Sequence, residues 1–289
     1  MCGILGTNFL SNDFNQALEI QNNRGPDYQN SIKIQDKQFG HNRLSIIDLN
    51  EEANQPMVFD DLLIVFNGEI YNYKQLIIDE QLECKTASDT EVLIRLYQKY
   101  DCDFLNKING MFSFCIYDMK KDKYFCARDR YGKKPFFYYF KDNKFIFASS
   151  IKSVLKLLDK KPNLNKVAVN KFLQYFVSYG EDTFYQNILK LEAATYFTYE
   201  PKKSKELVKK RFYKINTYKR IKEEPRALKD IEELLFKSVE SRLVGDVEVA
   251  SLLSGGIDSS LISALYTKIS GKKINTFSVG YDEYKNYCE

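Results

Sequence analysis

Histidine, tryptophan and paired cysteines are scarce in this sequence. Among its 289 residues there is no tryptophan and a single histidine, His41. The six cysteines form no CxxC pair, so the ligand spacing typical of a zinc site is missing. We therefore predict no metal site, and reduced thiols make the cytoplasm the default location.

Long apolar runs and a strong net charge are also missing. No stretch of about 18 apolar residues occurs, and the opening MCGILGTNFLSND has no basic region before an apolar core. These features argue against a membrane span and against a secretory signal. The formal net charge of +4 comes from 43 basic and 39 acidic residues, a balance too mild to indicate nucleic-acid binding.

Residues 2–200 are predicted to form one α+β domain. Short apolar or alternating runs, broken by Gly, Asn and Asp, are typical of strands. Ser88 is the predicted N-cap of a helix, with Glu91 as its capping-box partner. Strands between helices favour a layered domain. The predicted strands are 62–66, 112–117, 124–127 and 144–148, and the other predicted helices are 73–82 and 167–176.

The remaining chain divides into a linker and the opening of a second domain. Residues 201–225 are Lys-rich and lack a clear period, which predicts a linker rather than a nucleic-acid-binding arm, because no recognition module accompanies them. Residues 226–289 contain a predicted helix (228–243), strand (247–253), helix (261–268) and strand (276–279), the start of a parallel α/β domain. A complete α/β domain needs roughly 100 residues. We therefore expect this second domain to be truncated and the chain to be a fragment.

Five segments of the first domain occur in a specific order. They are Arg24–Asp27, His41–Asp48, Asn67–Asn72, Ser88–Glu91 and Asn109–Phe112, and they follow Cys2. Together they resemble the class II glutamine amidotransferase domain, an N-terminal-nucleophile hydrolase. With the second domain included, the whole chain resembles asparagine synthetase of the glutamine-hydrolysing kind. The resemblance implies a four-layer αββα sandwich followed by a truncated α/β PP-loop domain.

Cys2 is the candidate nucleophile. Hydrolysis of an amide by a thiol requires a base, and an α-amino group has a pKa of about 7.7–8.0. If Met1 is removed, the amine of Cys2 lies beside its own thiol and can accept the thiol proton. His41 is an alternative base. The resemblance and its place in a strand-like run favour a structural role for His41.

Asn67 and Gly68 are the candidate oxyanion hole. The tetrahedral intermediate of amide hydrolysis carries a negative oxygen that fixed donors must stabilise. The resemblance assigns this role to the side-chain amide of Asn67 and the backbone N–H of Gly68. Asn-Gly is also typical of a tight hairpin turn, and such a turn would expose the N–H as well.

The resemblance also implies a clamp for the amino-acid end of glutamine. A guanidinium suits a carboxylate, and Arg43 holds the matching position. Asp89 matches the group that receives the α-ammonium, although by itself it could simply be an acidic residue in the first turn of a helix. Arg24 and Asp27 are expected to shape the pocket. The other glutamine-binding positions implied are Leu44, Ser45, Ile46, Ile47, Asn67, Gly68 and Glu69.

The segment Ser254–Ser260, SGGIDSS, fits the SGGxDS pattern of PP-loop ATP pyrophosphatases. Glycines allow the backbone to approach an anion, and N–H groups at a helix N-terminus bind phosphate. A capped Gly-rich turn is the simpler interpretation, but its place between a buried strand and a helix favours ATP. The resemblance implies ATP with Mg²⁺ and no tightly bound organic cofactor. The implied ATP-binding residues are Leu253, Ser254, Gly255, Gly256, Asp258, Ser259, Ser260 and Val279.

The resemblance implies an ATP-dependent carbon–nitrogen ligase that uses glutamine as the amido donor. Ammonia would attack an acyl-adenylate of aspartate, the default acceptor, or of a related carboxylate such as a sugar acid. One alternative is a glutaminase that serves a sugar-phosphate acceptor, although that reaction has no need for an adenylating SGGIDSS loop. Another alternative is a glutaminase fragment or a non-catalytic binding remnant. A homodimer also stays open.

Overall fold

The computed structural model describes residues 1–203, 206–215, 217 and 223–280. The chain divides into two compact units, Met1–Lys214 and Ile215–Glu289, which are described separately below. Among the described residues, no helix combines the length and the apolar character that crossing a membrane requires.

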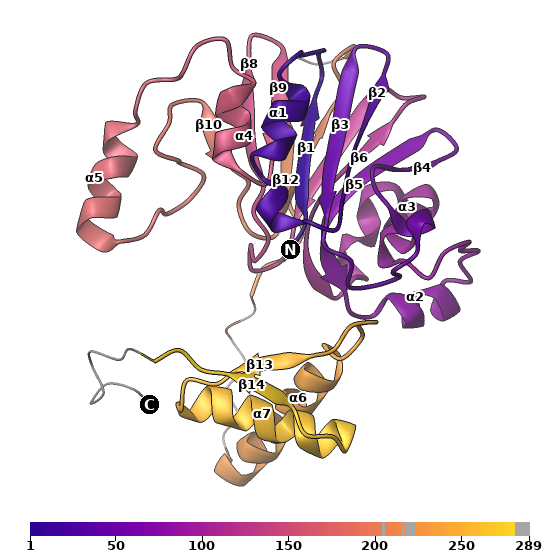
Figure 1. Ribbon diagram of the computed structural model, residues 1–289, viewed down its shortest axis with the longest axis vertical. Coiled ribbons are helices and arrows are strands. Elements are labelled where there is room, and N and C mark those ends of the chain that lie inside the picture. The colour runs from indigo at the N-terminus through magenta and orange to yellow at the C-terminus, as the bar shows by residue number, and fades with distance from the viewer. Residues whose placement is uncertain (204–205, 216, 218–222, 281–289) are drawn as a thin grey trace. The chain divides into compact units, whose positions relative to one another are not determined.

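The first sheet of unit 1 contains six strands, and its neighbouring strands run antiparallel (Figure 1). The N-terminal strand, Gly3–Thr7, pairs with Lys37–Arg43 on one side and Lys144–Ala148 on the other, so Cys2 lies next to the middle of the sheet. In spatial order the strands are β10 (Ile188–Lys190), β8 (Phe137–Lys141), β9 (Lys144–Ala148), β1 (Gly3–Thr7), β3 (Lys37–Arg43) and β2 (Tyr28–Ile34).

The second sheet of unit 1 also contains six antiparallel strands. Its long central strands confirm the predicted strands at 62–66, 112–117 and 124–127, just as β9 confirms the one at 144–148. In spatial order the strands are β12 (Val208–Arg211), β11 (Thr195–Tyr199), β7 (Lys123–Arg128), β6 (Gly110–Asp118), β5 (Leu62–Ile70) and β4 (Met57–Phe59).

Strand alternation gives each sheet two buried faces. In β5, Leu63 and Val65 point into the core between the sheets, whereas Ile64 and Phe66 lie on the opposite face, and all four are buried. In β1, Ile4 belongs to the same inter-sheet core, while the next residue, Leu5, packs beneath helices. Aromatic rings fill much of the inter-sheet core, which explains the high Phe and Tyr content of the chain.

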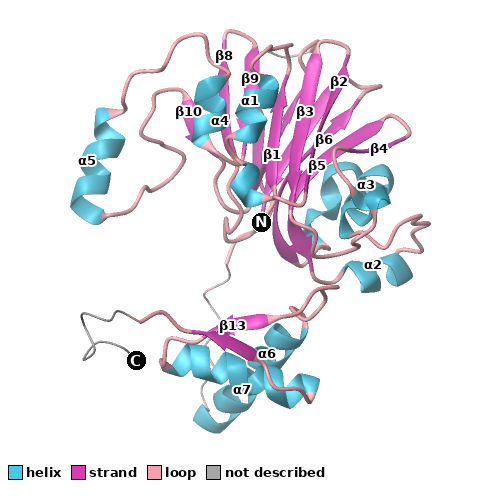
Figure 2. Cartoon of the chain, viewed as in Figure 1, coloured by secondary structure: helices cyan, strands magenta, loops and turns pink. Residues whose placement is uncertain are grey.

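Helices cover the outer faces of both sheets. α1 (Phe14–Glu19) and α4 (Ile151–Lys156) pack on the first sheet through the core around Leu5. α3 (Asp89–Tyr100) packs on the second sheet, where Tyr97 stacks on Phe125. Figure 2 shows these helices outside the two layers of strands, so the predicted four-layer αββα sandwich is confirmed. The remaining helices of the unit are α2 (Tyr73–Asp79) and α5 (Lys166–Tyr175), with 3₁₀ turns at Asn22–Arg24, Glu51–Ala53 and Asp101–Asn106.

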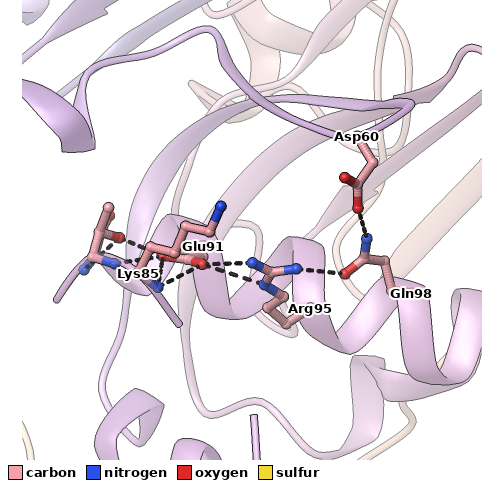
Figure 3. Close-up of polar contacts among 7 residues, drawn as sticks. Asp60, Lys85, Glu91, Arg95 and Gln98 are labelled. Atoms are coloured by element: carbon pink, nitrogen blue, oxygen red, sulfur yellow. Dashed lines mark hydrogen bonds and ion pairs between the residues drawn. The ribbon is translucent and has the colours of Figure 1, made fainter. Parts of the chain in front are cut away.

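The start of α3 confirms one half of the predicted capping box. The Ser88 side chain accepts a hydrogen bond from the Thr90 N–H at 3.2 Å, as an N-cap does. Glu91 does not reach back to Ser88. Its buried carboxylate instead accepts the N–H groups of Lys85 and Thr86 and pairs with Arg95 (Figure 3). Glu91 therefore holds the loop before α3 to the helix, and the Ser88 N–H donates instead to the Thr86 hydroxyl at 3.3 Å.

One strand lies inside the segment that the sequence predicted as a linker. Val208–Arg211 forms β12 and pairs with β11 in register, Thr195 opposite Arg211. All four residues of β12 are exposed, which explains why no apolar alternation marked them as a strand. Another part of the predicted linker lies outside the described residues.

Unit 2 contains a strand–helix–strand motif. β13 (Ala250–Leu252) and β14 (Asn275–Phe277) are parallel neighbours joined through α7 (Ile257–Ser270), and α6 (Glu224–Glu240) precedes them. This confirms the predicted opening of an α/β domain. Helix α7 begins four residues earlier than the predicted helix, which started at residue 261. Residues 281–289 lie outside the described residues.

Candidate active site

A pocket opens where the first residues of the chain meet both sheets of unit 1. Four elements converge there: the start of β1, the end of β3, the second half of β5 and the start of α3. The loops that follow β3, precede α3 and connect β7 to β8 complete the lining. The residues that line the pocket are Met1, Cys2, Arg43, Leu44, Ile46, Ile47, Ala53, Gln55, Phe66, Asn67, Gly68, Glu69, Ser88, Asp89, Thr90 and Lys134. Of the predicted glutamine-binding residues, only Ser45 is missing from this lining.

The Cys2 thiol is held against the backbone of Leu44. Its Sγ lies 3.4 Å from the Leu44 nitrogen, which donates to it, and 3.7 Å from the Leu44 carbonyl oxygen. Arg24 donates from Nε to the Cys2 carbonyl oxygen at 3.0 Å, which fixes the backbone of the residue. Burial raises the pKa of the Cys2 thiol, and the hydrogen bond from Leu44 partly opposes this.

The chain's terminal amine shares this pocket, whereas His41 does not line it. Burial lowers the pKa of the Met1 amine. His41 is fully buried in β3, with Nε2 3.0 Å from the Phe66 carbonyl oxygen. Burial lowers the pKa of His41 to about 3, so its ring is neutral at ordinary pH. Its contact with Phe66 lies next to Asn67 in β5, which is consistent with the structural role expected for His41.

Asn67 and Gly68 lie inside strand β5 and do not form a turn. Asn67 is opposite Ser113 and Gly68 is opposite Phe112 in the ladder with β6, and the strand continues to Ile70. The hairpin-turn interpretation of this Asn-Gly pair is therefore wrong, since pairing with β6 holds it extended. β4 pairs with β5 only as far as Ile64, so it does not pair with β5 at Asn67 and Gly68.

The Asn67 side chain is buried without a hydrogen-bonding partner. Its exposure is 0%, and neither Oδ1 nor Nδ2 finds a partner among the described residues. A buried amide left unpaired costs about 1–3 kcal/mol. Because Asn67 also lines the pocket beside Cys2, its amide is available to a molecule bound there.

Gly68 is required by the close approach of β6. A Cβ added at this position would lie 2.2 Å from the Met111 carbonyl oxygen and 2.8 Å from Phe112 Cα. Those are backbone atoms of a paired strand, so they cannot move aside as a flexible side chain would. The sequence motif is thus constrained sterically as well as chemically.

Arg43 lines the pocket, but its guanidinium also holds the loop that follows β3. Nη1 donates to the Asn50 carbonyl oxygen at 2.9 Å and to Asn54 Oδ1 at 2.7 Å, and Nη2 donates to the carbonyl oxygens of Ile47 and Asp48. The sequence predicted a substrate clamp and did not predict this loop-binding function, because nothing local pairs an arginine with carbonyls several residues ahead.

Asp89 brings a buried carboxylate to the pocket. It is the first residue of α3, and its Oδ2 accepts the Ile70 N–H at 2.9 Å. Burial raises the pKa of Asp89 to about 7, and the nearby Glu69 carboxylate adds to the rise. Asp27 lies at the edge of this region, where it accepts the Ser45 N–H at 2.8 Å. The pocket therefore contains acidic groups that suit an ammonium group.

Lys134 was not predicted from the sequence. Its side chain is buried, with 4% exposure, and it lines the pocket together with Cys2 and Glu69. From the sequence alone, a lysine between Lys133 and Pro135 would be expected on the surface, and only tertiary packing places it in the pocket. Within the described residues, no three His, Cys, Asp or Glu side chains are grouped to hold a metal ion.

The SGGIDSS loop of unit 2 connects β13 to α7. Gly256 is the N-cap of α7, and Gly255 has a φ of 82°, a left-handed conformation that favours glycine. Asp258, Ser259 and Ser260 belong to the first turn of the helix and are not part of a preceding turn as predicted. The helix starts early because a left-handed Gly255 completes the turn. Ser259 Oγ receives the Ser254 N–H at 3.3 Å, which closes the loop.

The two remaining predicted ATP-binding residues lie beyond the carboxyl ends of adjacent strands. Leu253 follows β13 and accepts the Ser278 hydroxyl at 2.6 Å through its carbonyl oxygen, while Val279 follows β14. Val279 is 80% exposed. In open α/β sheets ligands bind at this edge, and the loop and Val279 occupy the same edge here.

Both parts of the chain match known protein families. Residues 1–213 match the glutamine amidotransferase domain family, and residues 230–289 match the asparagine synthase family. A Methanocaldococcus jannaschii protein provisionally named asparagine synthetase (glutamine-hydrolyzing) 2 is 36% identical over 98% of this chain. Asparagine synthetase (glutamine-hydrolyzing) 1 of Bacillus subtilis is 34% identical over 98% of it. The chain covers 60% and 46% of these relatives, about half their length.

A solved structure supports the fold. The glutamine phosphoribosylpyrophosphate amidotransferase of Bacillus subtilis superposes with a TM-score of 0.52 at 16% identity, over 96% of this chain and 65% of that one. Together with the family match over residues 1–213, this assigns the αββα sandwich to the amidotransferase domain. The chain belongs to the glutamine amidotransferase domain family, and the segment that follows this domain matches the asparagine synthase family.

Proposed function

We propose that unit 1 hydrolyses glutamine with Cys2 as the nucleophile. The Cys2 Sγ attacks the side-chain amide carbon, and the α-amine, freed when Met1 is removed, accepts the thiol proton. The tetrahedral intermediate then collapses, and the carbon–nitrogen bond breaks as the amine returns the proton to the leaving ammonia. Water hydrolyses the resulting thioester to glutamate.

The unpaired Asn67 amide carries this proposal. The tetrahedral intermediate needs donors at its oxygen, and Asn67 Nδ2 and the Gly68 N–H are the groups we assign to it. A buried amide next to a thiol, with no partner of its own among the described residues, is costly unless a ligand uses it. Other roles for this Asn would leave that cost unexplained.

The amino-acid end of glutamine is assigned to the charged groups of the same pocket. We assign the substrate carboxylate to Arg43, assisted by the backbone of Leu44, Ile46 and Ile47, and the α-ammonium to Asp89 with Glu69. Because the Arg43 guanidinium already binds loop carbonyls, its contribution to the substrate includes holding that loop in place.

The second part of the proposal concerns the use of ammonia. We propose that residues 226–289 contribute an ATP site at the SGGIDSS loop, and that ATP with Mg²⁺ adenylates the acceptor carboxylate. Residues 201–225 connect this site to the glutaminase domain of residues 2–200, and the strand Val208–Arg211 within them extends the second sheet of that domain. Ammonia attacks this acyl-adenylate. Aspartate is the proposed acceptor because the names of the relatives specify asparagine synthesis. We place the reaction in the cytoplasm.

Glutamate release from glutamine tests the first step. Protein with Met1 removed should hydrolyse glutamine, and Cys2→Ala should abolish the activity. Cys84→Ala is the matched control, since Cys84 is a partly buried free thiol that does not line the pocket. Activity in Cys2→Ala equal to that of the Cys84→Ala control would refute the assignment of the nucleophile.

A further inference from the structure

The loop that carries Lys134 is held rigidly by two charged side chains. The Asp129 carboxylate accepts the N–H groups of Tyr131, Lys133 and Lys134, each at 3.0 Å. Arg128 donates from Nε to the Lys134 carbonyl oxygen at 2.7 Å. These bonds fix the backbone on both sides of Lys134 and so determine where its side chain points.

Lys134 brings a buried positive charge into the pocket beside Cys2. Only 4% of the residue is exposed, and it lines the pocket together with Cys2 and Glu69. Burial disfavours the ammonium form of Lys134, whereas the carboxylates of Glu69 and Asp129 favour it. A charge kept at this place by a fixed loop points to a function in the chemistry of the pocket.

We propose that Lys134 is a positioning residue for the nucleophile, whose ammonium group stabilises the thiolate of Cys2. This inference rests on the proposed glutaminase function. It adds a charge that acts on the nucleophile itself, separate from the groups assigned to the oxyanion and to the substrate.

The direction of the effect follows from the charged groups around the thiol. Burial raises the pKa of Cys2 and Asp89 adds to this rise, whereas the hydrogen bond from Leu44, the Met1 amine and Lys134 lower it. Around Lys134, Glu69, Cys2 and Asp129 favour the ammonium form, while burial and Arg24 oppose it. Removing Lys134 should therefore raise the pKa of the Cys2 thiol.

Alkylation of Cys2 by iodoacetamide reads this effect without requiring turnover. The alkylation rate follows the thiolate fraction, so the pH midpoint of the rate reports the pKa of the Cys2 thiol in each variant. In Lys134→Met the midpoint should rise by about one pH unit, and labelling near neutral pH should slow about tenfold. Lys134→Arg should keep the wild-type midpoint. Lys133→Met is the matched control, because Lys133 is exposed on the same loop and should leave the midpoint unchanged.

Thermal unfolding separates this role from a structural one. Because Lys134→Met replaces a buried charge with an apolar side chain of similar length, its Tm should be equal to or above that of the wild type. A wild-type midpoint in folded Lys134→Met overturns the proposal. If Lys134→Met does not fold, Lys134→Gln takes its place, and loss of folding in both variants shows a structural residue and also overturns it.

The outcome is distinguishable from failure of the proposed function. A wild-type protein that releases no glutamate but whose Cys2 midpoint still rises in Lys134→Met supports the charge effect and refutes the glutaminase. Glutamine hydrolysis that depends on Cys2, with a midpoint that does not move in Lys134→Met, leaves the glutaminase intact and refutes the role of Lys134.

Discussion

Replacing Asn67 with alanine should separate activity from stability. If its amide stabilises the oxyanion, Asn67→Ala should lower kcat for glutamine hydrolysis by about 10²–10³-fold. Most buried polar residues also stabilise the fold, but neither polar atom of Asn67 has a partner among the described residues. The substitution therefore removes two unpaired groups, a gain of roughly 1–3 kcal/mol each, offset by about 1–3 kcal/mol for the cavity that is left.

The free energy of unfolding of Asn67→Ala should thus lie within about 2 kcal/mol of the wild type, or above it. Denaturant titration measures this, and steady-state glutamate release measures kcat. Gln55→Ala is the matched contrast in the same pocket. Gln55 Oε1 accepts the Phe66 N–H at 2.6 Å and Nε2 donates to the Thr90 hydroxyl at 3.2 Å, so this variant should be clearly destabilised. If Asn67→Ala loses as much stability as Gln55→Ala, or keeps full activity, the reasoning is wrong.

Three other variants test the site. Gly68→Ala should destabilise the protein by several kcal/mol, seen in denaturant titration, because its Cβ would meet the Met111 carbonyl oxygen at 2.2 Å. For Asp89, a pKa of about 7 predicts weaker glutamine binding below that pH, seen as a rising KM, and in Asp89→Asn the KM should be high at every pH. Because the carboxyl has a pKa of 3.8 when unfolded and about 7 when folded, the Tm advantage of Asp89→Asn should grow between these pH values and stay constant above pH 7. Glu91→Gln should lower stability by about 2–4 kcal/mol in denaturant titration, since its buried carboxylate accepts two N–H groups and pairs with Arg95. An unchanged stability in Gly68→Ala or Glu91→Gln, or a pH-independent KM in the wild type, would contradict these accounts.

Much of the fold follows from local sequence signals. The strands that become β5, β6, β7 and β9 are apolar over several residues, because both faces of each sheet are covered, and such runs are visible in the sequence. The Ser88 cap is similarly local. β12 was missed because it is an exposed edge strand that takes its conformation from pairing with β11.

The site was predictable where residue type determines the chemistry and not where tertiary contacts do. Cys2, Asn67 and Asp89 were identified, and the structure brings them to one pocket. The local preference of Asn-Gly for a turn is overridden by the β6 ladder, which no local signal reports. Lys134 was missed for a related reason, since the loop that carries it is held by hydrogen bonds to Arg128 and Asp129 that no local sequence pattern reports.

Labelling with an electrophilic diazoketone analogue of glutamine tests the central claim most directly. With Met1 removed, the analogue should modify the Cys2 thiol in a one-to-one ratio, as read by mass spectrometry of the N-terminal peptide. Excess glutamine should slow the labelling, and glutaminase activity should fall in proportion to the modified fraction. Full glutaminase activity in protein whose Cys2 is completely labelled, or labelling that glutamine does not slow, would contradict the claim that Cys2 attacks glutamine in this pocket.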